Sequence, residues 1–295
     1  MPTLKRVLGI DALYDRLTTK YLNVTKPPVP MEEEWFPTGS AVFDTLLTGY
    51  ESGILTTIYG PAGTGKTTVC MLAAIATMKA GKKVIFIDTE SGFSTVRFKQ
   101  LLQNENTDDY LQKIFLLKPG AFNDQMRSIS RLKDLVNEKI GLIVVDSISM
   151  LYRIEIGKHE GVKAINADLG LQLYYLNGIA RKYNIPVLIT SQVYADFEEK
   201  EKVKVVGGDI LKYGSKCIIA IEKYKSYRKA LIVKHRSFPE AKAVVFKIEE
   251  NGFTLIPSQE SREEEERKKT KTETFQEKYP ELKGKEGFES AEIMR

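Results

Sequence analysis

The feature that most constrains the fold is a glycine-rich turn, GPAGTGKT, at residues 60–67. A β-branched apolar run at residues 54–59 precedes it, and a helical pattern covers residues 67–79, so the turn joins a buried strand to a helix. Glycines let successive backbone N–H groups turn inward around an anion, and the N-terminus of the helix adds positive potential there. The pattern predicts a phosphate-binding loop within an α/β fold.

The loop also assigns roles to single residues. Lys66 is expected to reach the β- and γ-phosphates of a nucleotide, and the Thr67 hydroxyl is expected to ligate Mg²⁺. A glycine-rich turn without function is the alternative, but the flanking strand and helix argue against it. The residues expected to hold the nucleotide in this segment are Gly60, Pro61, Ala62, Gly63, Thr64, Gly65, Lys66, Thr67 and Thr68.

Apolar runs and helical patterns alternate through most of the chain. The runs expected to form strands buried on both faces are 54–59, 84–87, 114–117, 142–145 and 187–190. The two helical stripes are Phe122, Met126, Ile129, Leu132 and Leu135, and then Leu169, Leu173, Leu176, Ala180 and Tyr183. This alternation predicts a mainly parallel sheet with helices on both faces. Three later runs, 217–221, 230–234 and 243–248, lack long helices between them and predict antiparallel strands at the C-terminal edge.

Composition divides the 295 residues into a core and two extensions. Residues 36–257 have the composition of a core, whereas residues 1–35 predict a helical extension with a proline-rich linker. The charged segment 258–295 has too few large apolar side chains to offset its ordering cost, so we expect it to be disordered. Cys70 and Cys217 lie in apolar runs, which favours buried thiols over a disulfide or a metal site.

The same composition bears on location and on charge. No apolar run approaches the roughly 18 residues that span a bilayer, and no secretory signal is visible at the N-terminus, so a cytoplasmic protein without a membrane contact is expected. Residues 258–295 hold nine Lys/Arg and eleven Asp/Glu, so the rest of the chain carries a formal net charge of +7, which favours an anionic partner only weakly.

Polar residues follow three of the predicted strands. Asp146 ends the run 142–145 and is expected on the metal side of the site, although such a residue can also cap a turn. Asp88 and Glu90 end another run. Glu90 could polarise an attacking water, or both residues could form the turn before a helix capped by Ser94. Gln192 ends a further run, where its amide could sense a γ-phosphate.

Taken in order, these segments resemble the core of the RecA/RadA family of recombinases over about residues 36–257, and especially an archaeal paralogue of the RadA recombinase. The motifs are FPTGS at 36–40, IYGPAGTGKT at 58–67, IDTESGF at 87–93, VVDSIS at 144–149, TSQV at 190–193, GGD at 207–209 and KHRSFPE at 234–240. The phosphate loop alone would indicate any P-loop nucleotide-binding protein. The whole set in this order is far more specific.

The resemblance implies a RecA-type fold with ATP and Mg²⁺ at the phosphate loop. It implies Glu90 as the catalytic glutamate, Asp146 at the metal and Gln192 as the γ-phosphate sensor, with Lys66 also in the catalytic site. Arg97, seven residues after Glu90, matches the family arginine that stacks on adenine, although a solvated helix charge is the alternative reading of the residue itself.

The family binds single-stranded DNA with two loops, which correspond here to residues 152–163 and 194–206. The first carries cations suited to phosphates, namely Arg153, Lys158, His159 and Lys163. The second mixes lysines with carboxylates, so a solvated loop is an equal interpretation. Tyr152, Tyr194 and Phe197 are sparse stacking platforms, which favours weak, non-specific binding of single-stranded or branched DNA.

His235 and Arg236 follow a predicted strand. A histidine satisfied at the sheet edge is one interpretation, and a contact with DNA or with a neighbouring subunit's nucleotide is the other. With two histidines in the whole chain, a zinc site is not expected.

Two departures from the active recombinases bear on function. Residues 1–35 show neither a helix–hairpin–helix DNA module nor an F-x-x-A polymerisation motif, which argues against filament formation and strand exchange. An F-x-x-A spacing does occur in the tail, at Phe288 and Ala291, where it could contact a RadA-type recombinase or lie in an inert tail.

Three functions remain open from the sequence. The first is a weak, DNA-dependent and Mg²⁺-dependent ATPase in homologous recombination and DNA repair. The second is a nucleotide-gated regulator or loader of a RadA-type recombinase, with negligible hydrolysis. The third is a KaiC-like signalling ATPase, which would normally show paired glutamates where Asp88-Thr-Glu90 stands.

Overall fold

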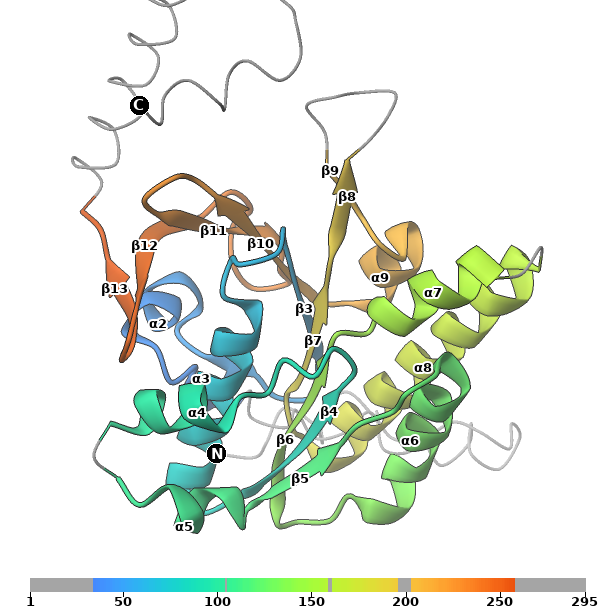
Figure 1. Ribbon diagram of the computed structural model, residues 1–295, viewed down its shortest axis with the longest axis horizontal. Helices are drawn as coiled ribbons and strands as arrows, with labels where there is room; N and C mark the ends of the chain where they lie inside the picture. The colour runs from blue at the N-terminus through green and yellow to red at the C-terminus, as the bar shows by residue number, and fades with distance from the viewer. Residues whose placement is uncertain (1–33, 104, 159–160, 196–202, 258–295) are drawn as a thin grey trace, which may run out of the picture. The chain divides into compact units, whose positions relative to one another are not determined.

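The computed structural model describes residues 34–103, 105–158, 161–195 and 203–257 (Figure 1). By its internal contacts the chain divides into residues 1–34 and 35–295, and every described helix and strand lies in the second unit. The predicted N-terminal helix and the charged tail with Phe288 and Ala291 lie outside the described residues, as does His159.

A nine-stranded sheet forms the centre of the fold, with the strand order β13-β12-β11-β10-β3-β7-β6-β4-β5. The parallel strands predicted from apolar runs are β3 (Leu55–Tyr59), β4 (Lys83–Asp88), β5 (Ile114–Leu117), β6 (Ile140–Asp146) and β7 (Val187–Ser191). Their carboxyl ends meet at one edge of the sheet, so the polar residues that follow them gather there. This is the predicted RecA-type α/β architecture.

The C-terminal strands extend this sheet beyond β3. They are β10 (Cys217–Lys223), β11 (Arg228–Lys234), β12 (Ala243–Glu249) and β13 (Gly252–Leu255). The last three continue in antiparallel pairs, as predicted for β11 and β12, whereas β13 was not among the predicted strands. The expectation that all of these strands would run antiparallel was wrong for β10, which pairs parallel with β3. The short helix α9 (Gly208–Gly214) before β10 lets the chain return to the starting end of the sheet.

Two small antiparallel pairs flank the central sheet. One joins β1 (Trp35–Phe36) to β2 (Tyr50–Glu51). The other joins β8 (Val193–Ala195) to β9 (Val203–Val205) and rises from the end of β7 (Figure 1).

Helices cover both faces of the sheet and close two hydrophobic cores. One face carries α2 (Ala41–Leu47), α3 (Lys66–Lys79), α4 (Thr95–Leu102) and the short α5 (Thr107–Leu111). The other carries α6 (Phe122–Leu135), α7 (Met150–Lys158), α8 (Val162–Tyr183) and α9. Figure 1 shows the two layers on either side of the strands.

Burial follows the predicted helical stripes with a few exceptions. Ile129 and Leu132 are fully buried in α6, but Leu135 is 51% exposed at the end of that helix. The prediction that every parallel strand is buried on both faces was wrong for β5, where Phe115 is 49% exposed. As the last strand of the sheet, β5 has a neighbour on one side only.

The predicted burial of the two cysteine thiols and the predicted helix cap at Ser94 are confirmed. Cys70 and Cys217 are both free and buried, and burial raises the pKa of Cys217 to about 12. Ser94 caps α4, because its Oγ accepts a hydrogen bond from the backbone N–H of Arg97 at 3.3 Å. None of the described helices is long and apolar enough to cross a membrane.

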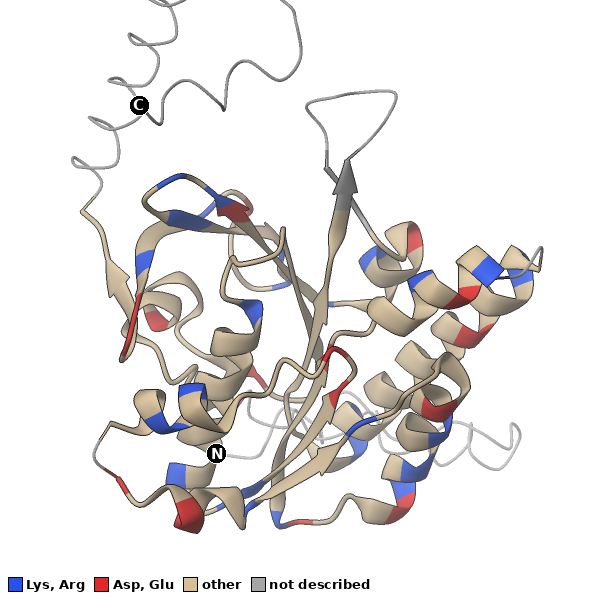
Figure 2. Cartoon of the chain, viewed as in Figure 1, with Lys and Arg blue, Asp and Glu red and all other residues tan. Residues whose placement is uncertain are grey.

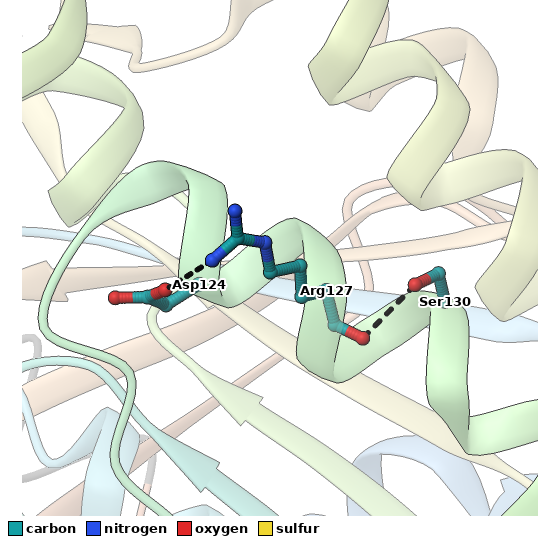
Figure 3. A network of polar contacts seen from close by, with 3 residues as sticks. All are labelled: Asp124, Arg127 and Ser130. Atoms are coloured by element: carbon teal, nitrogen blue, oxygen red, sulfur yellow. Dashed lines mark hydrogen bonds and ion pairs between the residues drawn. The ribbon is translucent and has the colours of Figure 1, made fainter.

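The outer face of α6 carries a short polar network (Figure 3). Arg127 Nη1 lies 3.4 Å from Asp124 Oδ1, and the Ser130 hydroxyl donates to the carbonyl oxygen of Arg127 at 2.9 Å. These groups are exposed, so the ion pair contributes at most ~1 kcal/mol to stability.

Candidate functional site

The phosphate loop connects β3 to α3 at the carboxyl edge of the sheet. Gly63 and Gly65 have φ values of +71° and +93°, in the left-handed region that glycine adopts without strain. Gly60 approaches the neighbouring strand so closely that a Cβ there would lie 2.2 Å from the carbonyl oxygen of Ile221. The glycines of the motif are therefore required by backbone geometry.

Lys66 is the first residue of α3, and its side chain turns back over the loop. Its Nζ donates to the carbonyl oxygens of Gly60 at 2.8 Å and Pro61 at 2.9 Å. Burial lowers the pKa of Lys66, while the nearby carboxylates of Asp146 and Glu90 act in the opposite direction. The ammonium group of Lys66 is thus held by oxygen atoms at the loop, a position suited to binding a phosphate.

Asp146 and Thr67 form the oxygen pair expected at a magnesium ion. Asp146 ends β6, is 4% exposed, and accepts hydrogen bonds from the hydroxyls of Thr67 and Thr190. Both lie beside Gly92, where a Cβ would be 3.5 Å from Thr67 Oγ1 and 3.9 Å from Asp146 Oδ2. Burial raises the pKa of Asp146, and the two hydroxyls partly counter that rise.

This donor set suits Mg²⁺. The ion prefers hard oxygen ligands, and it often binds to one or two protein oxygens, with phosphates and water completing the shell. The described residues contain no group of three or more histidine, cysteine or acidic side chains that could hold a metal without such help. Thr67 and Asp146 therefore fit a metal that arrives with a nucleotide.

Asp88 and Glu90 have separate roles in the structure. Asp88 is 1% exposed, and its two carboxylate oxygens accept from the backbone N–H groups of Gly92 at 2.9 Å and Phe93 at 3.1 Å. It shapes the turn after β4, which is the structural alternative considered from the sequence. Glu90 is exposed and takes part in different contacts.

Glu90 and Gln192 meet although 102 residues separate them in the chain. Gln192 Nε2 donates to Glu90 Oε1 at 2.9 Å, and the Ser147 hydroxyl donates to the same oxygen in a short hydrogen bond. The backbone N–H of Gln192 donates to Ser149 Oγ at 3.0 Å. The proposed catalytic glutamate and the proposed γ-phosphate sensor are thus in direct contact.

Arg97 lies on α4 and bridges to the turn between β12 and β13. Its guanidinium donates to the carbonyl oxygens of Glu249 at 2.9 Å and Glu250 at 2.8 Å, and to Gln100 Oε1 at 3.2 Å. Burial lowers the pKa of Arg97. The side chain fastens two elements to each other rather than standing in solvent, and adenine stacking stays a prediction.

The first predicted DNA segment, residues 152–163, is largely helical. The expectation of a loop was wrong, because α7 runs to Lys158 and α8 begins at Val162. Tyr152 is no stacking platform: it is 6% exposed, and its hydroxyl donates to Asn166 Oδ1 at 2.7 Å. Apolar contacts with α6 and α8 favour the helical conformation here.

The cations of this segment remain available on the surface. Arg153, Lys158 and Lys163 are exposed on α7 and at the start of α8. Lys158 Nζ lies 4.0 Å from Glu155 Oε2, so part of the positive charge is balanced. Figure 2 shows basic and acidic residues side by side on α7.

The second predicted DNA segment begins and ends as the two-stranded pair β8–β9 rather than as a free loop. The middle of this segment, residues 196–202, lies outside the described residues. It contains Phe197 and two of the lysines considered in the sequence analysis. Gln192 immediately precedes β8, so this pair begins beside the Glu90 contact.

His235 and Arg236 lie away from the other DNA candidates. β11 runs antiparallel to β10, so both residues follow a strand end at the edge opposite the phosphate loop. His235 Nδ1 accepts from the backbone N–H of Ser237 at 2.9 Å, and the ring stacks on Trp35 with a centroid distance of 6.1 Å. Arg236 forms an ion pair with the buried carboxylate of Glu51. Both take part in the fold, and a DNA contact stays a prediction.

Several residues of the site escaped the sequence reasoning. Ser147 and Thr190 hold Glu90 and Asp146, and Arg228 donates from Nε to the carbonyl oxygen of Gly63 at 3.2 Å. Ser147 and Thr190 lie within the quoted motifs, but nothing in the sequence indicated which side chains their hydroxyls would contact. Arg228 lies in the basic run KYKSYRK at 223–229, which was a visible signal.

Comparisons with known proteins bear on the family of the chain. A sequence profile described as Rad51 matches residues 35–255. The DNA repair and recombination protein RadB of Methanoculleus marisnigri is 41% identical over 230 residues, covering 77% of this chain and 100% of that protein. The RadB protein of Thermococcus sibiricus is 41% identical over 223 residues, with 74% and 94% covered. A crystal structure of the RadB recombinase has a TM-score of 0.65 and 36% identity, covering 75% of this chain and 100% of that one.

Proposed function

The chain belongs to the Rad51 family and is a relative of the RadB proteins within it, and from that premise we propose that it binds ATP with Mg²⁺ and DNA, and hydrolyses ATP weakly. The names of these relatives state DNA repair and recombination, and we propose homologous recombination and DNA repair as the processes that this chain serves. The observation that carries the ATP assignment is the pairing of Lys66 with the loop carbonyls beside Asp146 and Thr67.

The proposed binding step uses groups already near their working positions. Lys66 would exchange the carbonyl oxygens of Gly60 and Pro61 for phosphate oxygens, which are stronger partners because they carry full charge. Thr67 and Asp146 would hold Mg²⁺, which when bound neutralises phosphate charge and orients the triphosphate. The N–H groups of the loop and the first turn of α3 would receive the remaining phosphate oxygens.

The proposed hydrolytic step assigns Glu90 to the attacking water. A carboxylate activates water by accepting its proton, so Glu90 must turn an oxygen toward the γ-phosphate. In the structure one of its oxygens accepts from Ser147 and Gln192. Gln192 would then report the presence of the γ-phosphate to the β8–β9 pair, which follows it directly.

That same contact favours a second candidate function, a nucleotide-gated regulator of a RadA-type recombinase with negligible hydrolysis. Two hydrogen bonds to Glu90 Oε1 compete with its use as a base. A protein in which this contact persists with ATP bound would use the nucleotide as a switch. The two functions use the same proposed nucleotide site and differ in the rate of ATP turnover.

ATP binding by the intact chain tests the proposal. Titration with ATP and Mg²⁺ should show saturable binding, and Lys66→Ala should abolish it, because the ammonium supplies much of the charge compensation for the phosphates. Lys79→Ala is the matched control, since this lysine ends the same helix and is exposed. Unchanged affinity in Lys66→Ala would remove the ATP assignment.

A further inference from the structure

The hairpin between β10 and β11 is joined to the phosphate loop by one side chain. Arg228 Nε donates to the carbonyl oxygen of Gly63, while its Nη1 donates to the carbonyl oxygens of Tyr224 at 3.1 Å and Tyr227 at 2.9 Å. One guanidinium therefore fastens the turn of the hairpin to the loop, across 165 residues of sequence.

A second cation of the hairpin reaches the same loop residue. A Cβ placed on Gly63 would have Lys223 Nζ as its nearest neighbour, at 3.6 Å. Gly63 has no side chain to fill that space, so the ammonium of Lys223 can stand near the loop at this residue. Arg228 and Lys223 thus bring two positive groups to one point of the phosphate loop.

The hairpin is well placed to hold these groups still. Tyr224 and Tyr227 stack with a centroid distance of 4.6 Å and an interplanar angle of 15°, and Tyr227 is 1% exposed. The Tyr224 hydroxyl donates to Glu222 Oε2 at 3.1 Å, which places one carboxylate on the hairpin as well. Figure 2 shows basic residues in the region of this hairpin.

The geometry of the peptide bond explains why a hold on Gly63 matters. The carbonyl of Gly63 and the N–H of Thr64 belong to one planar trans peptide, so they point in opposite directions. When Arg228 binds that carbonyl, the Thr64 N–H is fixed pointing away from the hairpin. In a phosphate loop, N–H groups of this segment are the ones that bind phosphate oxygens.

We infer that the β10–β11 hairpin is a cationic arm of the nucleotide site, in which Arg228 positions the phosphate loop and Lys223 supplies positive potential to the phosphates. This inference rests on the proposed binding of ATP at that loop. Arg228 acts through the Gly63–Thr64 peptide, so it is a positioning residue. Lys223 acts by charge, so its effect must grow with the number of phosphates.

The test compares three glutamine variants of the intact chain. Arg228→Gln should weaken both ATP and ADP binding about tenfold, because a charge-assisted hold on the loop is lost. Lys223→Gln should weaken ATP binding several-fold more than ADP binding, because ATP carries more negative charge. Lys225→Gln is the matched control: it removes the same charge from the same hairpin and should leave both affinities within about twofold.

Further variants distinguish a positioning effect of Arg228 from an effect of its charge and from a loss of folding. Arg228→Lys keeps the charge but not the planar fork that joins three carbonyls, so it should not restore affinity. Full restoration by lysine, or Arg228→Gln binding like the intact chain, would overturn the inference. If Arg228→Gln fails to fold, the inference is tested by the ratio of ATP affinity to ADP affinity in Lys223→Gln. A ratio equal to that of the intact chain overturns the inference. An intact chain that binds no ATP would instead remove the proposed function itself.

Discussion

The proposed nucleotide site and the α7 segment are both polar regions of the same sheet edge, but they are built differently. At the proposed site, Asp88 and Asp146 are almost fully buried, and every carboxylate discussed accepts named hydrogen bonds. On α7, Arg153 and Lys158 are exposed, with one weak ion pair at 4.0 Å. The side chains of a buried hydrogen-bonded network are held in one conformation by their partners. Exposed cationic side chains can adjust their conformation to the phosphates of a ligand.

This difference predicts that single substitutions have large effects in the pocket and small, additive effects on α7. Removing one partner from a buried network leaves the other unsatisfied, which costs more than the bond itself. Removing one exposed cation takes away one phosphate contact among several.

Glu90→Gln should lower ATP turnover by roughly 10²-fold or more, because the amide cannot accept the proton of water. ATP affinity should change little, since Glu90 contacts Ser147 and Gln192 rather than the loop. Steady-state turnover and equilibrium binding, measured on the same preparation, check both parts. Equal turnover in the variant and the intact chain would remove Glu90 from the hydrolytic step.

Replacing Arg153, Lys158 and Lys163 together by glutamine should weaken single-stranded DNA binding for all sequences alike. The slope of log affinity against log salt should flatten by roughly 2, from about 0.7 for each lost phosphate contact. A matched triple variant of Lys79, Lys82 and Lys113 removes equal charge from the opposite end of β4 and β5. If both variants lose the same slope, net charge rather than a site on α7 explains binding.

Asp146→Asn should raise the melting temperature of the chain at neutral pH without Mg²⁺, because it removes a buried charge while its amide oxygen can still accept one of the two hydroxyl hydrogen bonds. Burial raises the pKa of Asp146, so its contribution to stability is present below the unfolded-state pKa of about 4 and is lost as pH rises through the folded pKa. The advantage of asparagine should therefore vanish at low pH. A variant that melts below the intact chain at neutral pH would contradict this reading.

Arg127→Ala should change the free energy of unfolding by less than about 0.5 kcal/mol, because its pair with Asp124 is exposed (Figure 3). Denaturant unfolding measures the change. A loss above 2 kcal/mol would show that exposed networks on α6 are as tightly coupled as those of the pocket.

The sequence predicted those parts of the fold that depend on neighbours in the chain. The five predicted parallel strands occur within two residues of their expected ends, because apolar runs and the turns between them are local signals. The glycines of the loop and the cap at Ser94 are local as well. Strand order and the parallel pairing of β10 with β3 depend on packing between distant segments, so they were beyond periodicity alone.

The site divides in the same way. The residues of the phosphate loop, Asp146 and Glu90 follow strands, so their gathering at one edge could be predicted. The contacts between Glu90 and Gln192 and between Gly63 and Arg228 join residues more than 100 positions apart. The helical conformation of residues 150–158 was missed because the expected loop came from the family resemblance, whereas contacts with α6 and α8 decide it here.

Steady-state ATP turnover with and without single-stranded DNA tests the central claim most directly. We expect slow, Mg²⁺-dependent turnover that rises when DNA is added and is absent from Lys66→Ala. Equal turnover in Lys66→Ala and in the intact chain would rule out an ATPase at the phosphate loop, and no turnover in the intact chain even with DNA would rule out hydrolysis.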